Sequence, residues 1–236
     1  MNNREYALIV AGGKGTRLKS KIGKQFLELN GLPVVMHTIL AFQRYAEEIT
    51  IILVLAEHDI DTWRSLCLKH NFRIPVILQH GGDTRYQSVK NGLDRIEGDG
   101  LVAIHDGVRP LVNAGIISTS FRLAAIKQSA VAAVPLKDSI RITTGQDRTL
   151  AVDRSLYRLI QTPQTFRVSL IREAYQRKED PDLTDDASIA ERAGHAVTLF
   201  EGSYENIKIT TAEDLVIAEA LLKRRDETTV PQNGKS

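Results

Sequence analysis

The chain has 236 residues, 42% of them hydrophobic and 25% charged, which is an ordinary composition for a folded globular protein. Its 31 basic and 29 acidic residues give a net charge of +2, so no global positive field argues for nucleic acid as a partner. The single cysteine, Cys67, cannot form an internal disulfide and favours a reducing, cytoplasmic location. The apolar run at residues 6–11 is too short for a membrane span.

Apolar runs of strand length alternate with segments of helical periodicity along the first part of the chain. We expect strands at 6–10, 49–56, 75–79, 101–106 and 130–136. We expect helices at 33–45, 59–71, 84–96 and 113–128. Because the strands are apolar throughout, the pattern predicts an α/β, Rossmann-like single domain with a mostly parallel twisted sheet and helices on both faces.

The alternation changes after residue 136. Residues 137–164 show a two-residue period about a turn at 144–147, which predicts a protruding two-stranded β-arm over about 137–161. An isolated hairpin is only marginally stable, so the arm must pack on something. A second copy of the chain is the economical partner, and we expect a homodimer.

The last third of the chain returns to helices and strands. We expect helices at 168–178 and 183–194, the second with Thr184 as its N-cap, and strands at 196–202 and 205–210. Thr210 and Glu213 have capping-box spacing before a final helix at 211–225. The predicted domain therefore covers 1–225, and 226–236 reads as a disordered tail.

A glycine-rich loop with cationic side chains follows the first strand, in the stretch "LIVAGGKGTRLKSKIGKQF". Leu18 stands where a dinucleotide fingerprint needs its third glycine and where a Walker motif needs its first, so both motifs fail. What remains is a turn whose backbone N–H groups can face an anion, with Arg17 and Lys24 within reach of the same charge. This resembles the nucleotidyltransferase signature GGxGxR followed by PK.

Further motifs narrow the resemblance. The stretches "GGDTRYQSV", "HDGVRP", "VDRSLYRLIQTPQTF", "TDDAS" and "ENIKIT" occur in this order along the chain. Together they resemble the family of 2-C-methyl-D-erythritol 4-phosphate cytidylyltransferases of the non-mevalonate isoprenoid pathway, over about residues 6–224. The related ribitol 5-phosphate cytidylyltransferases share several motifs but differ around "VDRS" and "TDDAS".

The resemblance implies a reaction in which CTP and methylerythritol phosphate give 4-diphosphocytidyl-2-C-methyl-D-erythritol and pyrophosphate. The sugar phosphate attacks the α-phosphorus in line, so positioning and electrostatics carry the catalysis. A phosphate monoester has a second pKa near ~6 and is mostly ionised at neutral pH, so no general base is needed. The implied cofactor is Mg²⁺, and the implied partners include neither nucleic acid nor a membrane.

The family's site residues map onto this chain position by position. Those implied to stabilise the transition state or to position the acceptor phosphate are Arg17, Lys24, Arg154 and Lys208. Those implied to bind the nucleotide are Ala11, Gly12, Gly13, Gly15, Gly82, Asp83, Ser88 and Asp106. Those implied to bind the acceptor are Asp106, Arg109, Ser139, Arg154, Thr184 and Lys208. Because Arg154 lies on the arm, the resemblance implies that each site takes this arginine from the partner subunit.

Three positions need separate comment. Asp106 ends an apolar strand, where a carboxylate can meet Mg²⁺ or the nucleotide, although it could also be a turn-forming residue before Gly107. His105 reads as structural, because the mechanism needs no titrating imidazole. Gly23 replaces the usual proline, which predicts a looser backbone beside Lys24.

Two other functions compete with this one. The first is a cytidylyltransferase for another polyol phosphate such as ribitol 5-phosphate. The second is a non-catalytic nucleotide-binding relative that kept the fold. Cations on both the nucleotide and the acceptor sides argue against the second, because a binding module needs only one set.

Overall fold

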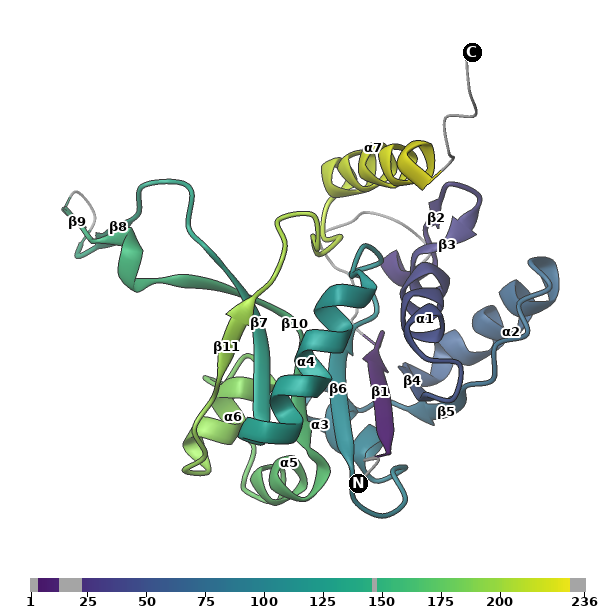
Figure 1. Cartoon of the computed structure of the whole chain (residues 1–236), viewed down its shortest axis with the longest axis horizontal. Coiled ribbons are helices and arrows are strands. Elements are labelled where there is room, and N and C mark those ends of the chain that lie inside the picture. The colour runs from purple at the N-terminus through teal and green to yellow at the C-terminus, as the bar shows by residue number, and fades with distance from the viewer. Residues whose placement is uncertain (1–3, 13–22, 146–147, 230–236) are drawn as a thin grey trace, which may run out of the picture.

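The computed structural model of the chain describes residues 4–12, 23–145 and 148–229. Its centre is a seven-stranded sheet in the order β11-β7-β10-β6-β1-β4-β5 (Figure 1). Their bounds in that order are Leu199–Glu201, Ser129–Pro135, Arg158–Arg167, Leu101–Asp106, Glu5–Val10, Thr50–Leu55 and Ile77–His80. Strand β10 is antiparallel to both of its neighbours, and the other pairs are parallel. The α/β class and the mostly parallel sheet are confirmed.

Helices cover both faces of the sheet, as the apolar strands predict. Side chains of successive β1 residues enter opposite cores, with Ala7 and Ile9 in one and Tyr6 and Leu8 in the other. The first core is closed by α1, α2 and α4, which are Val34–Tyr45, Ile60–Lys69 and Ala114–Lys127. The second is closed by α3, α5 and α6, which are Arg85–Leu93, Val168–Ala174 and Asp186–Arg192.

The predicted arm is present as a separate sheet. Strands β8 (Arg141–Thr143) and β9 (Thr149–Ala151) pair antiparallel, and their residues are exposed. Figure 1 shows them extending away from the central sheet. The turn residues 146–147 lie outside the described residues.

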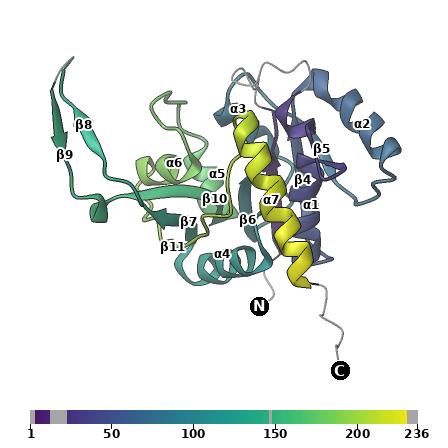
Figure 2. The same ribbon diagram turned by 90° about the horizontal axis from the view of Figure 1, so that it is seen from above.

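Helix α7 (Ala212–Thr229) lies beyond the carboxyl ends of the central strands, and Figure 2 shows it from above. It belongs to a third apolar cluster with Leu29, Val108 and Leu111, so it packs on the loops at that end of the sheet. Two short strands, β2 (Glu28–Leu29) and β3 (Leu32–Pro33), lie beneath it. The short 3-10 turns are Lys24–Phe26, Glu57–Asp59 and Arg154–Leu156.

The two helix caps expected from the sequence are wrong. The N-cap of α6 is Asp185 and not Thr184, because the Asp185 carboxylate accepts the N–H of Ser188 at 2.9 Å in a reciprocal capping box. At α7 the reciprocal pair is Thr211 with Asp214, in place of Thr210 with Glu213.

Residues 205–210, expected as a strand, form no ladder and are held by side-chain hydrogen bonds described below. The final helix continues to Thr229, past the predicted boundary at 225, and residues 230–236 lie outside the described residues.

We expect Gly92→Ala to destabilise the fold. A Cβ at Gly92 in α3 would lie 2.3 Å from Cδ1 of Leu8 and 2.9 Å from Cγ2 of Val54. Overpacking there costs about 1–3 kcal/mol, more than the ~1 kcal/mol gained in helix propensity. Urea denaturation should show a lower free energy of unfolding. Gly115→Ala, at an exposed position in α4, is the control; its Cβ would lie 3.3 Å from Oδ1 of Asn113, and it should lower the free energy of unfolding less than Gly92→Ala. Equal effects of the two substitutions would contradict this packing account.

Candidate active site

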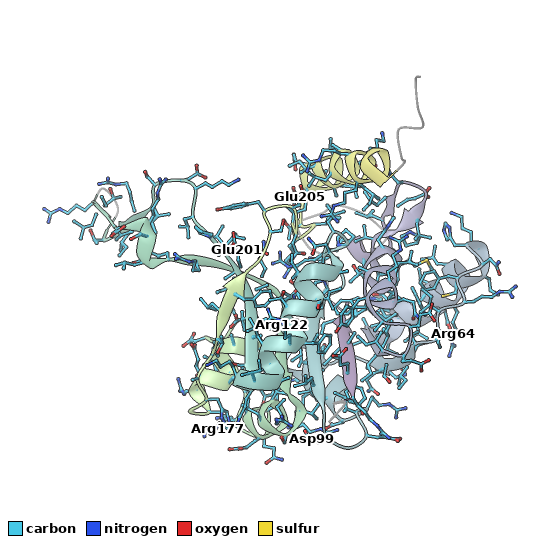
Figure 3. The ribbon with its side chains drawn as sticks, in the orientation of Figure 1. Arg64, Asp99, Arg122, Arg177, Glu201 and Glu205 are labelled. Carbon is cyan, nitrogen blue, oxygen red and sulfur yellow. The ribbon has the colours of Figure 1, made fainter. Side chains whose placement is uncertain are left out.

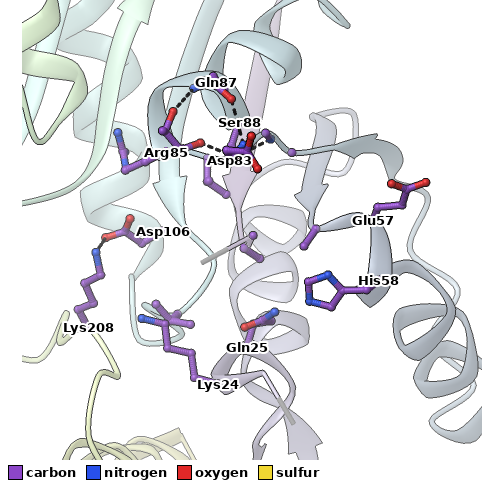
Figure 4. Close-up of a pocket in the computed structure, with 18 residues that line it drawn as sticks. Lys24, Gln25, Glu57, His58, Asp83, Arg85, Gln87, Ser88, Asp106 and Lys208 are labelled. Atoms are coloured by element: carbon purple, nitrogen blue, oxygen red, sulfur yellow. Dashed lines mark hydrogen bonds and ion pairs between the residues drawn. The ribbon is translucent and has the colours of Figure 1, made fainter. Parts of the chain in front are cut away.

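A cavity of about 760 Å³ opens at the carboxyl ends of the parallel strands, where open α/β sheets bind ligands (Figure 4). The predicted nucleotide-binding residues that line it are Ala11, Gly12, Gly82, Asp83, Ser88 and Asp106. Lys24 and Lys208 line it too. Gly13, Gly15 and Arg17 fall in 13–22, outside the described residues. Eight of the 18 described residues that line this cavity were therefore among the residues predicted from the sequence.

The glycine pair after β5 is packed against the first turn of α3. The Gly82 N–H donates to Oγ of Ser88 at 3.1 Å, and the same hydroxyl donates to the Thr84 carbonyl at 2.9 Å. A Cβ at Gly82 would lie 2.3 Å from Cβ of Gln87. Any side chain at position 82 would therefore collide with α3, a reason for glycine besides the close approach of a ligand. The result is a fixed loop whose backbone lines the cavity.

Lys24 begins a 3-10 turn that follows Gly23. Gly23 adopts φ −54°, a value that proline also adopts. A Cβ at position 23, however, would lie 2.7 Å from Nε2 of Gln25. That amide donates to Oδ2 of Asp59 at 2.8 Å, and Gln25 is buried. Glycine thus leaves room for the Gln25 side chain beneath Lys24.

Asp106 is a buried carboxylate at the end of β6, surrounded by cations. Its Oδ2 lies 3.1 Å from Nζ of Lys208 and 3.1 Å from Nε of Arg109. Burial alone raises the pKa of this carboxyl, but Lys208, Arg85 and Arg109 together outweigh it and hold the pKa well below its usual range. Asp106 is therefore ionised at neutral pH. Its carboxylate fixes the cations in place, which goes beyond the turn-forming role that the sequence left open.

His105 is structural, as the sequence analysis favoured. Its ring is fully buried, packs edge-on against Phe42 at 5.2 Å, and places Nε2 3.2 Å from the Arg109 carbonyl oxygen. Burial lowers the pKa of His105 to about 4, so the imidazole is neutral at physiological pH. It holds the turn that presents Asp106 and Arg109.

A second cavity of about 400 Å³ adjoins the first. Its polar wall includes the predicted acceptor residues Asp106, Arg109, Thr184 and Lys208. Arg85, Asp106 and Lys208 line both cavities, so the two spaces meet at a cationic boundary. Ile160, Gln161, Thr162, Gln164 and Asp185 complete the wall. Hydroxyl, amide and carboxylate groups of this kind suit a polyol.

The segment that carries Lys208 is held by a hydrogen-bond network that the sequence analysis missed. The fully buried Asn206 donates from Nδ2 to the Thr162 backbone carbonyl at 2.8 Å. The backbone carbonyl of Asn206 accepts from Nη1 of Arg109 at 2.8 Å. Gln161 is bonded to the N–H and the carbonyl of Ser203. These bonds replace the expected strand ladder and fix Lys208 beside Asp106. The only sequence signal was the polar Asn206 beside the alternating apolar residues Ile207 and Ile209 of "ENIKIT".

Two predicted residues lie elsewhere in the single chain. Ser139 and Arg154 are exposed residues that flank β8 and β9 in the arm, and neither lines either cavity. The Arg154 guanidinium donates to the Lys137 carbonyl. Within one chain, Arg154 and Lys208 are therefore not brought together. That each active site contains Arg154 from the partner subunit stays a prediction.

Comparison with known proteins agrees with this geometry. A sequence model of the family described as 2-C-methyl-D-erythritol 4-phosphate cytidylyltransferase matches residues 6–224. The chain belongs to this family. Members of this family are named as cytidylyltransferases, and therefore as nucleotidyltransferases.

Individual relatives match along nearly their whole length. The chain is 46% identical over 216 residues to the 2-C-methyl-D-erythritol 4-phosphate cytidylyltransferase of Bacteroides fragilis, covering 92% of this chain and 98% of that protein. It is 47% identical over 221 residues to that of Azobacteroides pseudotrichonymphae, covering 93% and 99%. The crystal structure of 4-diphosphocytidyl-2C-methyl-D-erythritol synthase from Anaerococcus prevotii superposes with a TM-score of 0.79 at 29% identity, covering 94% and 99%. No helix in the described part of the chain is long and apolar enough to cross a membrane.

We expect the effect of Gly23→Pro to depend on Gln25. Proline restricts the unfolded chain and can add about 0.4–1 kcal/mol of stability where φ fits, but here its Cβ meets the Gln25 amide. The gain should be absent in the wild type and appear in a Gln25→Ala background. Urea denaturation of all four proteins measures this coupling as a double-mutant cycle. The same change in both backgrounds would show that Gln25 does not restrict position 23.

Proposed function

We propose that this chain transfers CMP from CTP to 2-C-methyl-D-erythritol 4-phosphate, giving 4-diphosphocytidyl-2-C-methyl-D-erythritol and pyrophosphate in isoprenoid biosynthesis. Family membership over residues 6–224 supports this reaction. The structural observation that carries it is the boundary of Arg85, Asp106 and Lys208 shared by the two cavities. Two anionic substrates can meet end to end there, one from each side. The single cysteine suits the reducing cytoplasm as the location.

In this proposal CTP lies in the larger cavity. Its base and ribose contact Gly82, Asp83 and Ser88, and its triphosphate follows the loop that begins at Ala11. Arg17 and Lys24 stabilise the charge that accumulates around the α-phosphorus, while Lys208 and Arg109 receive the acceptor phosphate from the other side. Thr184 contacts the polyol.

The chemistry needs no proton transfer to start. An oxygen of the acceptor phosphate attacks the α-phosphorus, the bond to the β-phosphate bridging oxygen breaks, and pyrophosphate leaves with that electron pair. The acceptor is mostly ionised at neutral pH, because the second pKa of a phosphate monoester is near ~6. The protein's task is to hold two anions together against their repulsion, for which fixed cations are suited.

We infer that Mg²⁺ enters with the nucleotide. When bound, it would neutralise part of the charge on the phosphates. The ionised carboxylate of Asp106 fits this role, because Mg²⁺ in such sites takes one or two carboxylates besides the phosphates. Among the described residues, no cluster of three or more His, Cys, Asp and Glu side chains could hold a metal. Metal binding through Asp106 would therefore depend on the nucleotide.

The arm supports a homodimer in which Arg154 and Ser139 complete the partner's site. Exposed apolar side chains on and beside the arm include Ile142 at 49%, Leu150 at 60% and Leu156 at 80%. Such side chains need a partner surface to be removed from water. The exposed position of Arg154 is the one expected of a residue that acts in another subunit.

The substrate assignment is tested by pyrophosphate release. CTP, UTP and ATP are each incubated with 2-C-methyl-D-erythritol 4-phosphate and with ribitol 5-phosphate. We expect release to be fastest with CTP and the methylerythritol substrate. A preference for ribitol 5-phosphate would support the alternative function as a cytidylyltransferase for that polyol phosphate. CTP binding without any release would support a non-catalytic relative.

Shared sites are tested by mixing two inactive variants. Arg154→Ala and Lys208→Ala should each be nearly inactive, because each site then lacks one cation. When the two chains are co-expressed, half of the dimers are heterodimers and each has one intact site, so about a quarter of wild-type activity should return. No recovery in purified heterodimers would show that Arg154 acts within its own chain, or not at all.

A further inference from the structure

Arg85 is a cation at the junction of the two cavities; it lies in the stretch "GGDTRYQSV" but was given no role from the sequence. It is the first residue of α3, directly after the loop that lines the nucleotide cavity, and its side chain lines both cavities. Figure 4 shows it on the same side of the larger cavity as Asp106 and Lys208. Its side chain is 30% exposed. A ligand in either cavity can therefore reach it.

The guanidinium is held from behind by a buried carboxylate. Nη1 and Nη2 of Arg85 donate to Oδ1 and Oδ2 of Asp186 at 2.8 and 2.7 Å, and Asp186 is fully buried at the start of α6. A paired, two-point contact of this kind fixes both the position and the plane of the guanidinium. Lysine could supply the charge but not the orientation.

The carboxylate is itself fixed by a tyrosine. The buried Tyr175 hydroxyl donates to Oδ1 of Asp186 at 2.6 Å. Burial and the adjacent Asp186 raise the pKa of Tyr175 well above its usual range, so the hydroxyl stays protonated. The Tyr86 ring lies 4.8 Å from that of Tyr175, and its hydroxyl donates to the Tyr175 carbonyl at 2.7 Å. The Arg85 guanidinium is thus held in a fixed orientation by Asp186 and Tyr175.

The contacts with Asp186 leave some N–H donors of the Arg85 guanidinium unused. A guanidinium has five N–H groups, and the contacts to Asp186 take two of them. No other acceptor in the described part of the chain takes the rest. A partly exposed guanidinium with unused donors, oriented by a buried carboxylate, is suited to bind a phosphate.

We propose that Arg85 is a further catalytic residue, which binds the phosphate of the acceptor at the junction as that phosphate approaches the α-phosphorus. Asp186 and Tyr175 are its positioning residues. The acceptor is favoured over the nucleotide because the anchor belongs to α6, which directly follows the acceptor-cavity residues Thr184 and Asp185. The inference rests on the proposed cytidylyl transfer and adds a third cation to Lys208 and Arg109.

The test compares Arg85→Gln with a matched control. Arg167 pairs with Asp99 at 3.4 Å and is 31% exposed, so Arg167→Gln removes an equally exposed arginine from an Arg–Asp pair whose carboxylate is 53% exposed. Figure 3 shows Asp99 at the opposite end of the sheet from Glu205, which lies on the segment that carries Lys208. In Arg85→Gln we expect kcat/KM for the acceptor to fall about 100-fold while KM for CTP changes by less than about threefold. Arg167→Gln should leave both within about threefold.

Two more variants distinguish the loss of the Arg85 contact with the acceptor from a loss of folding stability. Arg85→Gln leaves Asp186 buried without its partner, so thermal unfolding is measured on each protein. The double variant Arg85→Gln with Asp186→Asn removes the stranded charge and should show the same acceptor-specific loss while folded. Arg85→Lys should have a kcat/KM for the acceptor less than about tenfold higher than that of Arg85→Gln, because lysine keeps the charge without the paired contact.

The outcomes are distinct. Acceptor kinetics within about threefold of wild type, in a folded single or double variant, would overturn the role of Arg85. So would a rise in KM for CTP with unchanged acceptor kinetics, which would assign Arg85 to the nucleotide. A wild-type protein that releases no pyrophosphate would instead remove the proposed function, and this inference with it.

Discussion

The buried carboxylate of Asp106 is the contact on which the site depends. A carboxylate in a buried position is costly unless it is paired, and here the pairs are Lys208 and Arg109, both at 3.1 Å. Lys208 and Arg109 depend on Asp106 in turn, because the two cations would repel one another without a carboxylate between them. One strand end thus assembles a positive boundary from distant parts of the chain. Phosphate groups can approach this boundary from two cavities.

The fold supplies the rigidity that this arrangement needs. Parallel strands bring β1, β4 and β6 to a common edge, and the segments beyond that edge are fixed by hydrogen bonds. Asn206 ties the Lys208 segment to β10 and to Arg109, and Asp186 ties α6 to α3 through Arg85. Catalysis by electrostatics works only when charges are held in advance, so these anchors belong to the function as much as to the fold.

The sequence predicted what local patterns encode. Apolar strands and a carboxylate at a strand end are visible along the chain, and they led to the sheet and to Asp106, whereas the family resemblance supplied Gly82, Asp83 and Ser88 around the loop after β5. The partners of Arg85 and Asn206 could not be predicted, because these hydrogen bonds join residues about a hundred and about forty positions apart and leave no periodic pattern in the sequence. The Lys208 segment was taken for a strand for the same reason. Its alternating apolar residues Ile207 and Ile209 resemble a strand, while its hydrogen bonds come from Gln161, Asn206 and Arg109.

The central claim is that cations keep Asp106 ionised within the protein. Its pKa is most directly measured by following the Asp106 carboxyl carbon with ¹³C NMR as the pH of the metal-free, ligand-free protein is lowered from 7 to about 4. Because the folded-state pKa is depressed, the account predicts an unchanged, ionised signal over this whole range. A signal that has moved towards the protonated form by pH 4, as that of an aspartate with the ordinary pKa of 3.8 would, would contradict it, because the cations would then not be acting on this carboxylate.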